Sequence, residues 1–581
     1  MLPEDKKTFI QSVKVLRKRG VNTPRKAEGA IRAMLYLWQK RDFPELAKDE
    51  PSKISKYLLD PIVRSHAKWI SEKPFLDGAF WLSSTYAILL GKELQSRFAM
   101  YFTPPILANR LIDNLISNGA SLTDHCWKDP ACGGGAFLLP TAIRMIEELQ
   151  RRGIAAKSII KKLSKNLVGT DINPLLVMLS IEFIRMAAYR EIIESRCDLE
   201  LQISVADSLS SVEMLRSAEV VICNPPYRKM TRSEWLPYQE HFGHIITGQP
   251  NIYSLFIQKC IELASQAGRI GLLTPTSYLS GQHFSKLRRS INTLTSVQQL
   301  DLIIEKEGIF LGVEQEAVLS VLIRESKTSP STTKVFALSK STFNKIGSCA
   351  LPKDCSAWPV PRNIGDTLTL TSAGKSPYRL KDYGYRIRTG AYVDYRDSRT
   401  TYMTYPSKEI TKAVFPLIWS GDITAKNKLD HGRTSSRDHR PTFIEMTNPI
   451  HQSVVRRPCL ALQRVTSTDQ DRRLIGAEIP EQLLLEFGGV VGENHVLFLE
   501  WNDEKVGIPP SLMVDLLSSY SVDRLFRCIS GAVNVSIFEL DQLPLPDPSI
   551  LINLLSKKNI SVDEAVNQAY ILTDRVKKSH N

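Results

Sequence analysis

The tetrapeptide Asn224-Pro225-Pro226-Tyr227 follows a run of apolar residues, 220–223, that has the composition of a buried strand. The two prolines stiffen the backbone after this strand, so its carbonyl groups do not turn back into a ladder. Asn224 and Pro225 therefore offer two hydrogen-bond acceptors, and the Tyr227 ring offers a flat face that suits a planar heterocycle. A stiff loop with a buried tyrosine is the alternative interpretation, but it leaves the asparagine unexplained.

Three further features with chemical potential precede this tetrapeptide. The run Gly133–Gly135 lies between a predicted strand and a helix, where glycine permits positive φ and close approach of a nucleotide-like ligand. It lacks the spaced GxGxxG signature and the P-loop lysine, so it predicts no bound pyrophosphate or triphosphate. Asp171 and Asp207 each end a predicted strand; a carboxylate at Asp171 can accept hydrogen bonds from both hydroxyls of a ribose, and Asp207 can contact an adenine amino group. An exposed loop aspartate is the alternative for Asp171.

The elements that position these residues alternate between short β-rich runs and amphipathic helices from about residue 96 to 340. This alternation predicts an α/β fold, a doubly wound Rossmann-like parallel sheet, with the polar residues at its carboxyl edge. Thr103 is predicted to cap a helix whose first residue is Pro104, although a capped amphipathic helix by itself indicates no function.

The chain of 581 residues is too long for one hydrophobic core, so we expect several domains. Residues 1–95 carry helical spacing and predict a helical N-terminal region; residues 96–345 form the α/β domain. In residues 346–581 Pro, Gly, Thr and Arg become more frequent, which predicts a β-rich module that ends in helices.

The chain is basic, with a net charge of +14, which suits a polyanion such as nucleic acid or an anionic membrane surface; many soluble proteins are mildly basic without such a partner. Nine scattered cysteines form no CxxC pair and have no histidines at zinc-ligand spacing, so we expect reduced, structural cysteines, no metal and a cytoplasmic location. No apolar segment is long enough to predict a membrane span.

As an ordered set, the segments YFTPP, DPACGGGAFL, GTDINP, ADSL and CNPPY resemble the adenine-N6 DNA methyltransferases of restriction-modification systems. The resemblance covers about residues 90–345 and is to the gamma arrangement, in which cofactor motifs precede the catalytic motif and a target recognition domain comes last. Asn-Pro-Pro-Tyr alone is shared with methyltransferases that act on glutamine in protein, guanine in RNA or cytosine. Gly134 is more often serine in the family, a difference that we expect to have no effect.

This resemblance implies S-adenosyl-L-methionine as the cofactor and a flipped-out adenine as the substrate. It implies that the catalytic residues are Asn224, Pro225, Pro226, Tyr227 and Phe310, the last as a second aromatic face for the base. It implies that the cofactor is bound by Thr103, Pro104, Asp129, Ala131, Gly133, Gly135, Asp171, Ile172 and Asp207. Among these, Thr103 and Pro104 would contact the methionine part and Asp129 its amino group.

Residues 346–550 resemble, more loosely, target recognition domains, which implies double-stranded DNA as the partner. The arginines expected to contact DNA are Arg386, Arg388, Arg396, Arg399, Arg464, Arg472 and Arg473. An arginine-rich solvated surface is the alternative. No nuclease motif is evident, so a separately encoded restriction endonuclease would be the cutting partner. Competing hypotheses are an RNA or protein-glutamine methyltransferase, and a specificity or scaffold subunit that acts only within a larger complex.

Overall fold

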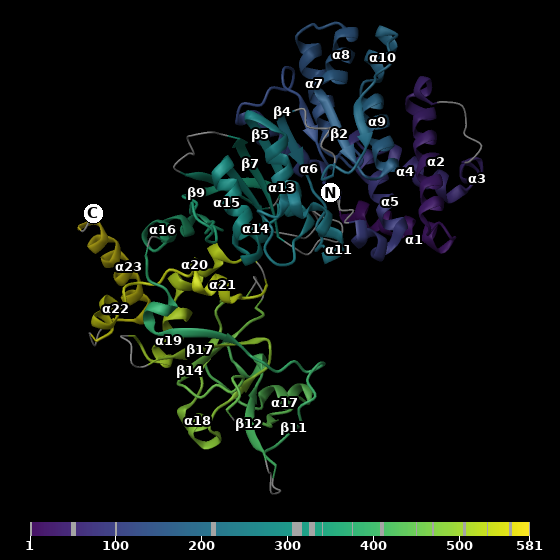
Figure 1. The fold of residues 1–581 in the computed structure, drawn as a ribbon. Helices are drawn as coiled ribbons and strands as arrows, with labels where there is room; N and C mark the ends of the chain where they lie inside the picture. The colour runs from purple at the N-terminus through teal and green to yellow at the C-terminus, as the bar shows by residue number, and fades with distance from the viewer. Residues whose placement is uncertain are drawn as a thin grey trace. The chain divides into compact units, whose positions relative to one another are not determined.

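The structure is a computed structural model of the chain. It describes residues 3–47, 54–98, 102–210, 217–304, 316–324, 332–339, 341–374, 376–406, 412–448, 450–466, 470–502, 507–531, 533–556 and 560–579. These residues divide into two compact units, and the main boundary falls between Lys345 and Ile346. The short segments 279–282 and 346–352 belong to the second unit, and 353–355 belongs to the first. Figure 1 shows the course of the chain.

Helices dominate the first hundred residues, as the sequence predicts. They are α1 (Pro3–Lys18), α2 (Pro24–Asp42), α3 (Ser55–Leu58), α4 (Pro61–Ser71) and α5 (Phe75–Phe98). The entry of α4 follows the expected chemistry, because the Asp60 side chain accepts hydrogen bonds from the first free N–H groups of the helix. These helices do not form a core of their own: their buried apolar side chains belong to one cluster with those of the following sheet domain.

A contact between α2 and α9 (Pro174–Ala187) illustrates this shared core. The rings of Trp38 and Phe183 lie 6.1 Å apart, and Gln39 Nε2 donates to Glu182 Oε2 at 2.7 Å. The N-terminal helices are therefore packed directly on a helix of the sheet domain.

The first unit is built on one nine-stranded sheet with the order β3-β2-β1-β4-β5-β7-β6-β8-β9. The strands are β1 (Trp127–Asp129), β2 (Leu167–Asp171), β3 (Gln202–Val205), β4 (Ala218–Cys223), β5 (Ala264–Pro275), β6 (Thr295–Ile303), β7 (Ala317–Arg324), β8 (Thr333–Ser339) and β9 (Thr342–Cys349). Strands β1 to β5 pair in parallel, whereas β7 runs antiparallel between β5 and β6. The predicted doubly wound α/β fold is confirmed.

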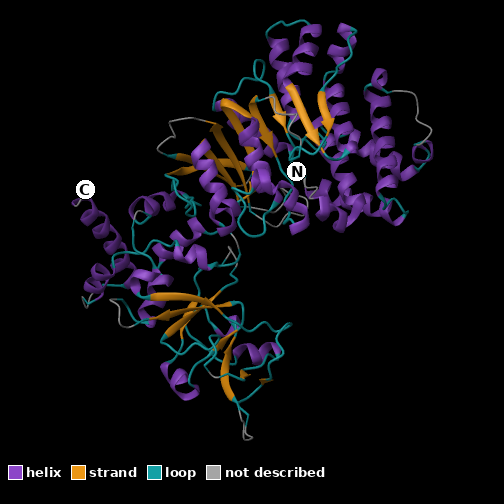
Figure 2. Ribbon diagram, viewed as in Figure 1, coloured by secondary structure: helices purple, strands orange, loops and turns teal. Residues whose placement is uncertain are grey.

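Helices flank this sheet, as Figure 2 shows. The helices in this part of the chain are α6 (Pro105–Ser117), α7 (Leu138–Arg151), α8 (Ala156–Asn166), α9, α10 (Tyr189–Ser195), α11 (Arg232–Trp235), α12 (Gln239–Phe242), α13 (Ile252–Leu263), α14 (Ser277–Ser280) and α15 (Ser285–Leu294). The order of strands reverses between β1 and β4. In a sheet with right-handed crossovers, such a reversal opens a crevice at the carboxyl ends of the two strands.

The second unit contains two four-stranded sheets with the orders β10-β17-β14-β15 and β11-β13-β12-β16. The strands are β10 (Tyr385–Thr389), β11 (Thr401–Tyr402), β12 (Ala413–Ile418), β13 (Phe443–Met446), β14 (Cys459–Gln463), β15 (Gly476–Glu478), β16 (Val491–Gly492) and β17 (Val496–Trp501). The helices are α16 (Ile364–Ser372), α17 (Arg433–Asp438), α18 (Glu481–Phe487), α19 (Pro510–Ser518), α20 (Tyr520–Ile529), α21 (Ile537–Asp541), α22 (Pro548–Leu555) and α23 (Val562–Ser579). This β-rich region ends in helices, as predicted.

One predicted helix start is wrong by a residue. Helix α6 begins at Pro105, its N-cap residue is Pro104, and no side chain caps it. Thr103 lies outside the helix and its hydroxyl is used elsewhere, as described below. The sequence Thr-Pro-Pro permits both starts, because either proline tolerates the first helical position.

All nine cysteines lie in described residues and are free thiols. Across the described ranges, no helix is both long and apolar enough to cross a membrane.

Candidate active site

The predicted polar residues meet at the carboxyl edge of the parallel strands. Asp129 and Asp171 are the last residues of β1 and β2, Asp207 follows β3 by two residues, and Asn224 follows β4 directly. These four strands are neighbours in the order β3-β2-β1-β4 and run parallel, so their ends lie along one edge. The reversal of strand order places Asp129 and Asn224 on either side of the crevice.

The glycine turn after β1 is held by Asp171. Gly133 has a φ of +51° and Gly135 a φ of +79°, conformations that favour glycine. Gly133 N–H donates to Asp171 Oδ2 at 3.0 Å, and the N–H of Asn173 donates to Asp171 Oδ1 at 2.8 Å. The Asp171 carboxylate therefore orders both the glycine turn and the start of α9.

Two serines from different helices limit the space for a side chain at Gly134 and Gly135. A Cβ atom at Gly135 would lie 2.9 Å from Ser180 Oγ, and one at Gly134 would lie only 2.3 Å from Ser83 Oγ. Ser83 belongs to α5, in the N-terminal region. A serine at position 134 would therefore require the Ser83 side chain of α5 to move, so the expectation that this difference has no effect omits a steric contact.

The aspartates that end β1 and β2 differ in exposure, since Asp171 is half-buried and Asp129 is almost completely buried. Asp129 is 1% exposed and accepts a hydrogen bond from Ala131 N–H at 3.0 Å. Burial, and to a smaller extent the nearby Asp171 carboxylate, raise the pKa of Asp129 to about 8. Burial also raises the pKa of Asp171, against the effect of its backbone hydrogen bonds. A cationic group at this edge would favour ionised Asp129.

Asp207 has a partner that sequence reasoning missed. Tyr238 donates its hydroxyl proton to Asp207 Oδ2 at 2.8 Å, while Leu209 N–H donates to Oδ1 at 3.0 Å. Tyr238 lies 14 residues after Asn224 in a short 3-10 helix, Leu236–Tyr238, and no motif marks it. At the tip of β2, Ile172 is 69% exposed, an apolar surface beside the carboxylate of Asp171.

The side chain of Asn224 is oriented from both ends. Its Nδ2 donates to Thr103 Oγ1 at 2.9 Å, and its Oδ1 accepts from the Tyr227 hydroxyl. The same hydroxyl lies 2.7 Å from the Leu273 carbonyl oxygen, and since it has one proton it donates to one of these acceptors at a time. Thr103 is 3% exposed, so the hydroxyl that accepts from the Asn224 amide is buried.

The rest of the tetrapeptide combines a buried proline with a half-buried ring. Pro225 is buried, and no group in the described residues donates to its carbonyl oxygen. Pro226 is half-buried. The Tyr227 ring makes an edge contact with Tyr253, with centroids 6.2 Å apart, and burial raises the pKa of Tyr227 well above its usual range.

Phe310, predicted as a second aromatic beside the substrate, lies outside the described residues, and its predicted role stays a prediction. Within the described residues, no group of three His, Cys, Asp or Glu side chains could hold a metal ion.

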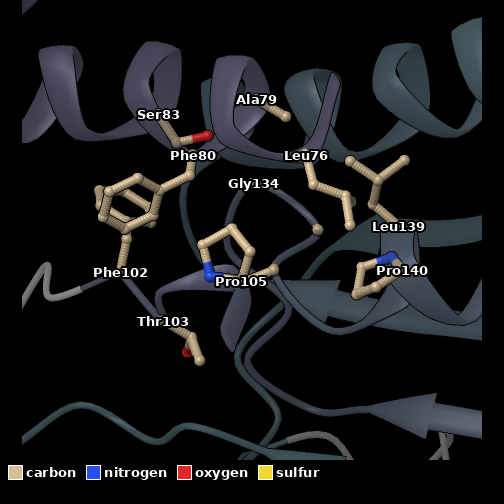
Figure 3. A pocket seen from close by; sticks show the side chains of 12 residues that line it. Leu76, Ala79, Phe80, Ser83, Phe102, Thr103, Pro105, Gly134, Leu139 and Pro140 are labelled. Atoms are coloured by element: carbon tan, nitrogen blue, oxygen red, sulfur yellow. The ribbon is translucent and has the colours of Figure 1, made fainter. Parts of the chain in front are cut away.

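A pocket lies between α5 and the glycine turn, as Figure 3 shows. It is lined by Leu76, Ala79, Phe80, Ser83, Phe102, Thr103, Pro105, Gly134, Gly135, Ala136, Leu139 and Pro140. Of the predicted site residues, it includes Thr103 and Gly135. Its contribution from α5 was missed, because a buried serine in an apolar helix carries no mark of function in a sequence.

Three comparisons with known proteins bear on this edge of the sheet. The family model described as Eco57I restriction-modification methylase matches residues 165–310. The type II methyltransferase M.BsuBI of Bacillus subtilis is 24% identical over 348 residues, which are 57% of this chain and 66% of that protein. The type II methyltransferase M.PstI of Providencia stuartii is 22% identical over 377 residues, 60% of this chain and 70% of that protein.

The chain is similar to restriction-modification DNA methyltransferases. This confirms the predicted resemblance at that level. Among solved structures, the type IIL restriction-modification enzyme MmeI, determined in complex with DNA, superposes with a TM-score of 0.55 at 11% identity, over 98% of this chain and 95% of that one. At this identity the likeness concerns the fold.

The seven arginines that were predicted to contact DNA all lie in the second unit, and they differ in exposure. Arg386 and Arg396 are exposed. Arg473 is 1% exposed; its Nε donates to Thr466 Oγ1 at 3.0 Å and its guanidinium lies over the Phe526 ring. The prediction that Arg473 contacts DNA is wrong, because this side chain is part of the protein core.

The other four predicted arginines are half-buried and have internal partners. Arg388 pairs with Glu500 and Arg399 with Asp397. Arg464 donates to the Asn494 carbonyl at 3.0 Å, and Arg472 donates to Asn427 Oδ1 at 3.1 Å. Their charges are largely committed to the fold of the second unit.

Proposed function

We propose that the chain is a site-specific DNA methyltransferase that transfers a methyl group from S-adenosyl-L-methionine to the N6 amine of an adenine. The observation that carries this proposal is the pair of acceptors at the end of β4. Asn224 Oδ1 is oriented by Thr103, and the Pro225 carbonyl has no donor among the described residues. Both follow the strand that borders the crevice, next to the carboxylates of β1 and β2.

The residues at this edge suit the cofactor. Asp171 is half-buried, its carboxylate keeps lone pairs for ribose hydroxyls, and exposed Ile172 offers an apolar surface to an adenine. Asp207 would accept from the adenine amino group. Asp129 would bind the cationic amino group of the methionine part, whose positive charge offsets the cost of ionising a buried carboxyl.

The remaining cofactor contacts come from the backbone and from the start of α6. Gly133 and Gly135, with Ala131, let the chain approach the cofactor closely, and Thr103 and Pro104 would border its methionine part. When bound, S-adenosylmethionine supplies an electrophilic methyl group on a sulfonium.

The protein's part in the chemistry is to orient and polarise the amine. The N6 lone pair of adenine is delocalised into the ring, which makes it a poor nucleophile. Acceptors at Asn224 and Pro225 would hold the two N6 hydrogens out of the ring plane and so free the lone pair. The amine would form its bond to the methyl carbon as the C–S bond breaks, the electron pair of that bond would stay on the sulfur, and one N6 proton would then pass to water. The two acceptors stabilise the positive charge that develops on nitrogen, so the main catalytic terms are orientation and preorganised electrostatics.

In a stacked duplex the N6 atom is inaccessible to such a site, so the adenine must be flipped out. The Tyr227 ring would stack on the flipped base and recover part of the unstacking cost of a few kcal/mol. Phe310 would stack on the opposite face, and Pro226 would hold the loop that presents Tyr227.

Double-stranded DNA is the substrate best supported by charge and relatives. The chain carries a net charge of +14, and M.BsuBI and M.PstI are named type II methyltransferases. The second unit would act as the target recognition domain, residues 1–95 as a helical region and residues 96–345 as the catalytic domain. We further propose a cytoplasmic enzyme that serves as the modification arm of a restriction-modification system with a separate endonuclease.

Sequencing of native DNA tests this function. We would express the chain in a bacterial host that lacks DNA methylation, with Asn224→Ala as the matched control, and detect modified bases by single-molecule sequencing. N6-methyladenine in one short motif, present only with the unmodified chain, is the expected result. Methylated cytosine would overturn the adenine assignment, and no methylated base in either sample would direct the assignment to RNA, protein glutamine or a multisubunit complex.

A further inference from the structure

Helix α5 reaches the glycine turn that the proposed cofactor site requires. Four of its residues, Leu76, Ala79, Phe80 and Ser83, line the pocket opposite Gly134 and Gly135 (Figure 3). A helix of the N-terminal region is therefore a wall of this pocket, beside residues of the sheet domain.

Ser83 is the one polar side chain that α5 places in this wall. It is 3% exposed, and its hydroxyl makes no hydrogen bond to any residue that the structure describes. Ser83 Oγ lies 2.3 Å from the position of a Cβ at Gly134, so a larger residue at 134 would require the Ser83 side chain to move. Ser83 lines the pocket, so a ligand there could form a hydrogen bond with its hydroxyl.

The position of the pocket along the sheet edge indicates which part of the cofactor it would contact. Asp171 and Asp207, proposed for the ribose and adenine, follow β2 and β3, and neither lines the pocket. Thr103 does line it, and Thr103 also bonds Asn224, the residue proposed to hold the reacting amine. The pocket is thus at the end of the site nearer to Asn224, where the sulfonium and the amino-acid group must lie if the adenine lies at β3.

The pocket has polar and apolar lining residues that suit the amino-acid end of the cofactor. Ser83, Thr103 and the backbone of Gly134 provide polar atoms for the carboxylate of such a group. Apolar side chains provide the remaining surface, which excludes water from these contacts; they are Leu76, Ala79, Phe80, Phe102, Pro105, Ala136, Leu139 and Pro140.

We infer that α5 completes the cofactor site and that the Ser83 hydroxyl hydrogen-bonds the amino-acid end of S-adenosylmethionine. This inference rests on the proposed function. It assigns to the N-terminal helices a part in cofactor binding, by way of one hydroxyl group.

Equilibrium binding to the full chain, measured by calorimetry, tests this inference. Ser83→Ala should raise the Kd of S-adenosylmethionine and of S-adenosylhomocysteine roughly tenfold, as expected for one hydrogen bond to a charged group. The Kd of 5′-methylthioadenosine, which lacks the amino-acid group, should not change. Ser84→Ala is the matched control, because Ser84 is the next residue of α5, is also buried without a hydrogen-bond partner, and does not line the pocket.

The ligand set separates the possible results. Equal weakening of all three ligands would show a structural role for Ser83 and overturn the inference, as would unchanged binding of S-adenosylmethionine to Ser83→Ala. Failure of the unmodified chain to bind S-adenosylmethionine would instead overturn the proposed function, and this inference with it.

A relocated hydroxyl provides a second test. Gly134 does not have a positive φ, so serine there is hindered only by Ser83. The double variant Ser83→Gly/Gly134→Ser carries the hydroxyl on the turn in place of α5. It should bind S-adenosylmethionine more tightly than Ser83→Gly alone; equal or weaker binding would contradict the inference.

Discussion

The carboxyl edge of the first unit's sheet and the arginines of the second unit were predicted from the same sequence, with different success. At the sheet edge, Asp129, Asp171, Asp207 and Asn224 lie together at the ends of neighbouring strands. In the second unit, five of the seven predicted arginines have hydrogen-bond or ion-pair partners, and Arg473 is buried.

The difference has a physical origin. Parallel strands joined by right-handed crossovers end on the same edge, so a polar residue at the end of each strand has only one region in which to lie. An arginine-rich composition carries no such constraint, because a guanidinium serves equally well on DNA, on a carboxylate of a neighbouring strand or over an aromatic ring. Position relative to a strand end is thus more informative than residue type.

The largest expected effect tests the sheet edge. Asn224→Ala should lower the rate of methyl transfer by roughly 100-fold or more, by analogy with loss of one oxyanion-hole donor. Cofactor binding should be largely preserved, because Asn224 is placed on the amine and not on the cofactor. Single-turnover kinetics and calorimetry on the same preparation check both parts. Turnover near that of the unmodified chain would refute the catalytic assignment.

The next effect compares two arginines of the second unit. Arg473→Met should lower the free energy of unfolding by about 2 kcal/mol, because Thr466 and the Val533 carbonyl lose a buried donor. Arg396→Ala removes an exposed side chain and should leave stability unchanged. Denaturant unfolding checks this difference.

The Arg396→Ala variant also tests whether this exposed arginine binds DNA. If Arg396 contacts a phosphate, Arg396→Ala should weaken DNA binding at all sequences and reduce the slope of log K against log salt by about 1. An unaltered slope would remove Arg396 from the DNA surface. If Arg473→Met and Arg396→Ala lowered the free energy of unfolding equally, the distinction between a structural Arg473 and an exposed Arg396 would be wrong.

The sheet edge also contains contacts that the sequence did not reveal. Thr103 was predicted to cap α6 and to contact the cofactor, but its hydroxyl accepts from Asn224, 121 residues later in the chain. Tyr238 and Ser83 were missed because each reaches the site through tertiary packing and follows no strand end. Motif spacing predicts which backbone positions meet, whereas the side chains that orient them come from elements whose docking is decided by the whole core.

Asp129 provides a smaller, pH-dependent effect. Its pKa is raised to about 8 from an ordinary value near 3.8, so between these values the folded chain binds more protons at this site than the unfolded chain does. Stability from this group is therefore lost as pH rises, at up to about 1.4 kcal/mol per pH unit, until the pH passes 8.

Asp129→Asn should remove this loss, because an amide oxygen still accepts from Ala131 and cannot ionise. The stability of the variant relative to the unmodified chain should increase from pH 5 to pH 8 and then level off. Denaturant unfolding without cofactor at pH 5, 6, 7, 8 and 9 measures this difference in the free energy of unfolding. A difference that does not vary with pH would show that Asp129 ionises normally.

The smallest effect concerns the Tyr227 hydroxyl, which separates orientation of Asn224 from stacking on the base. Tyr227→Phe removes the hydrogen bond to Asn224 Oδ1 but keeps the ring, and Thr103 still holds the other end of the amide. The rate of methyl transfer should therefore fall only several-fold, the effect of about one neutral hydrogen bond. Tyr227→Ala also loses the ring and should be slower still, since base–aromatic stacking contributes about 1–3 kcal/mol. Tyr253→Phe is the matched control, because its hydroxyl bonds Ser277 outside the site. If Tyr227→Phe were as slow as Tyr227→Ala, the hydroxyl and not the stacked ring would be the main contribution of Tyr227.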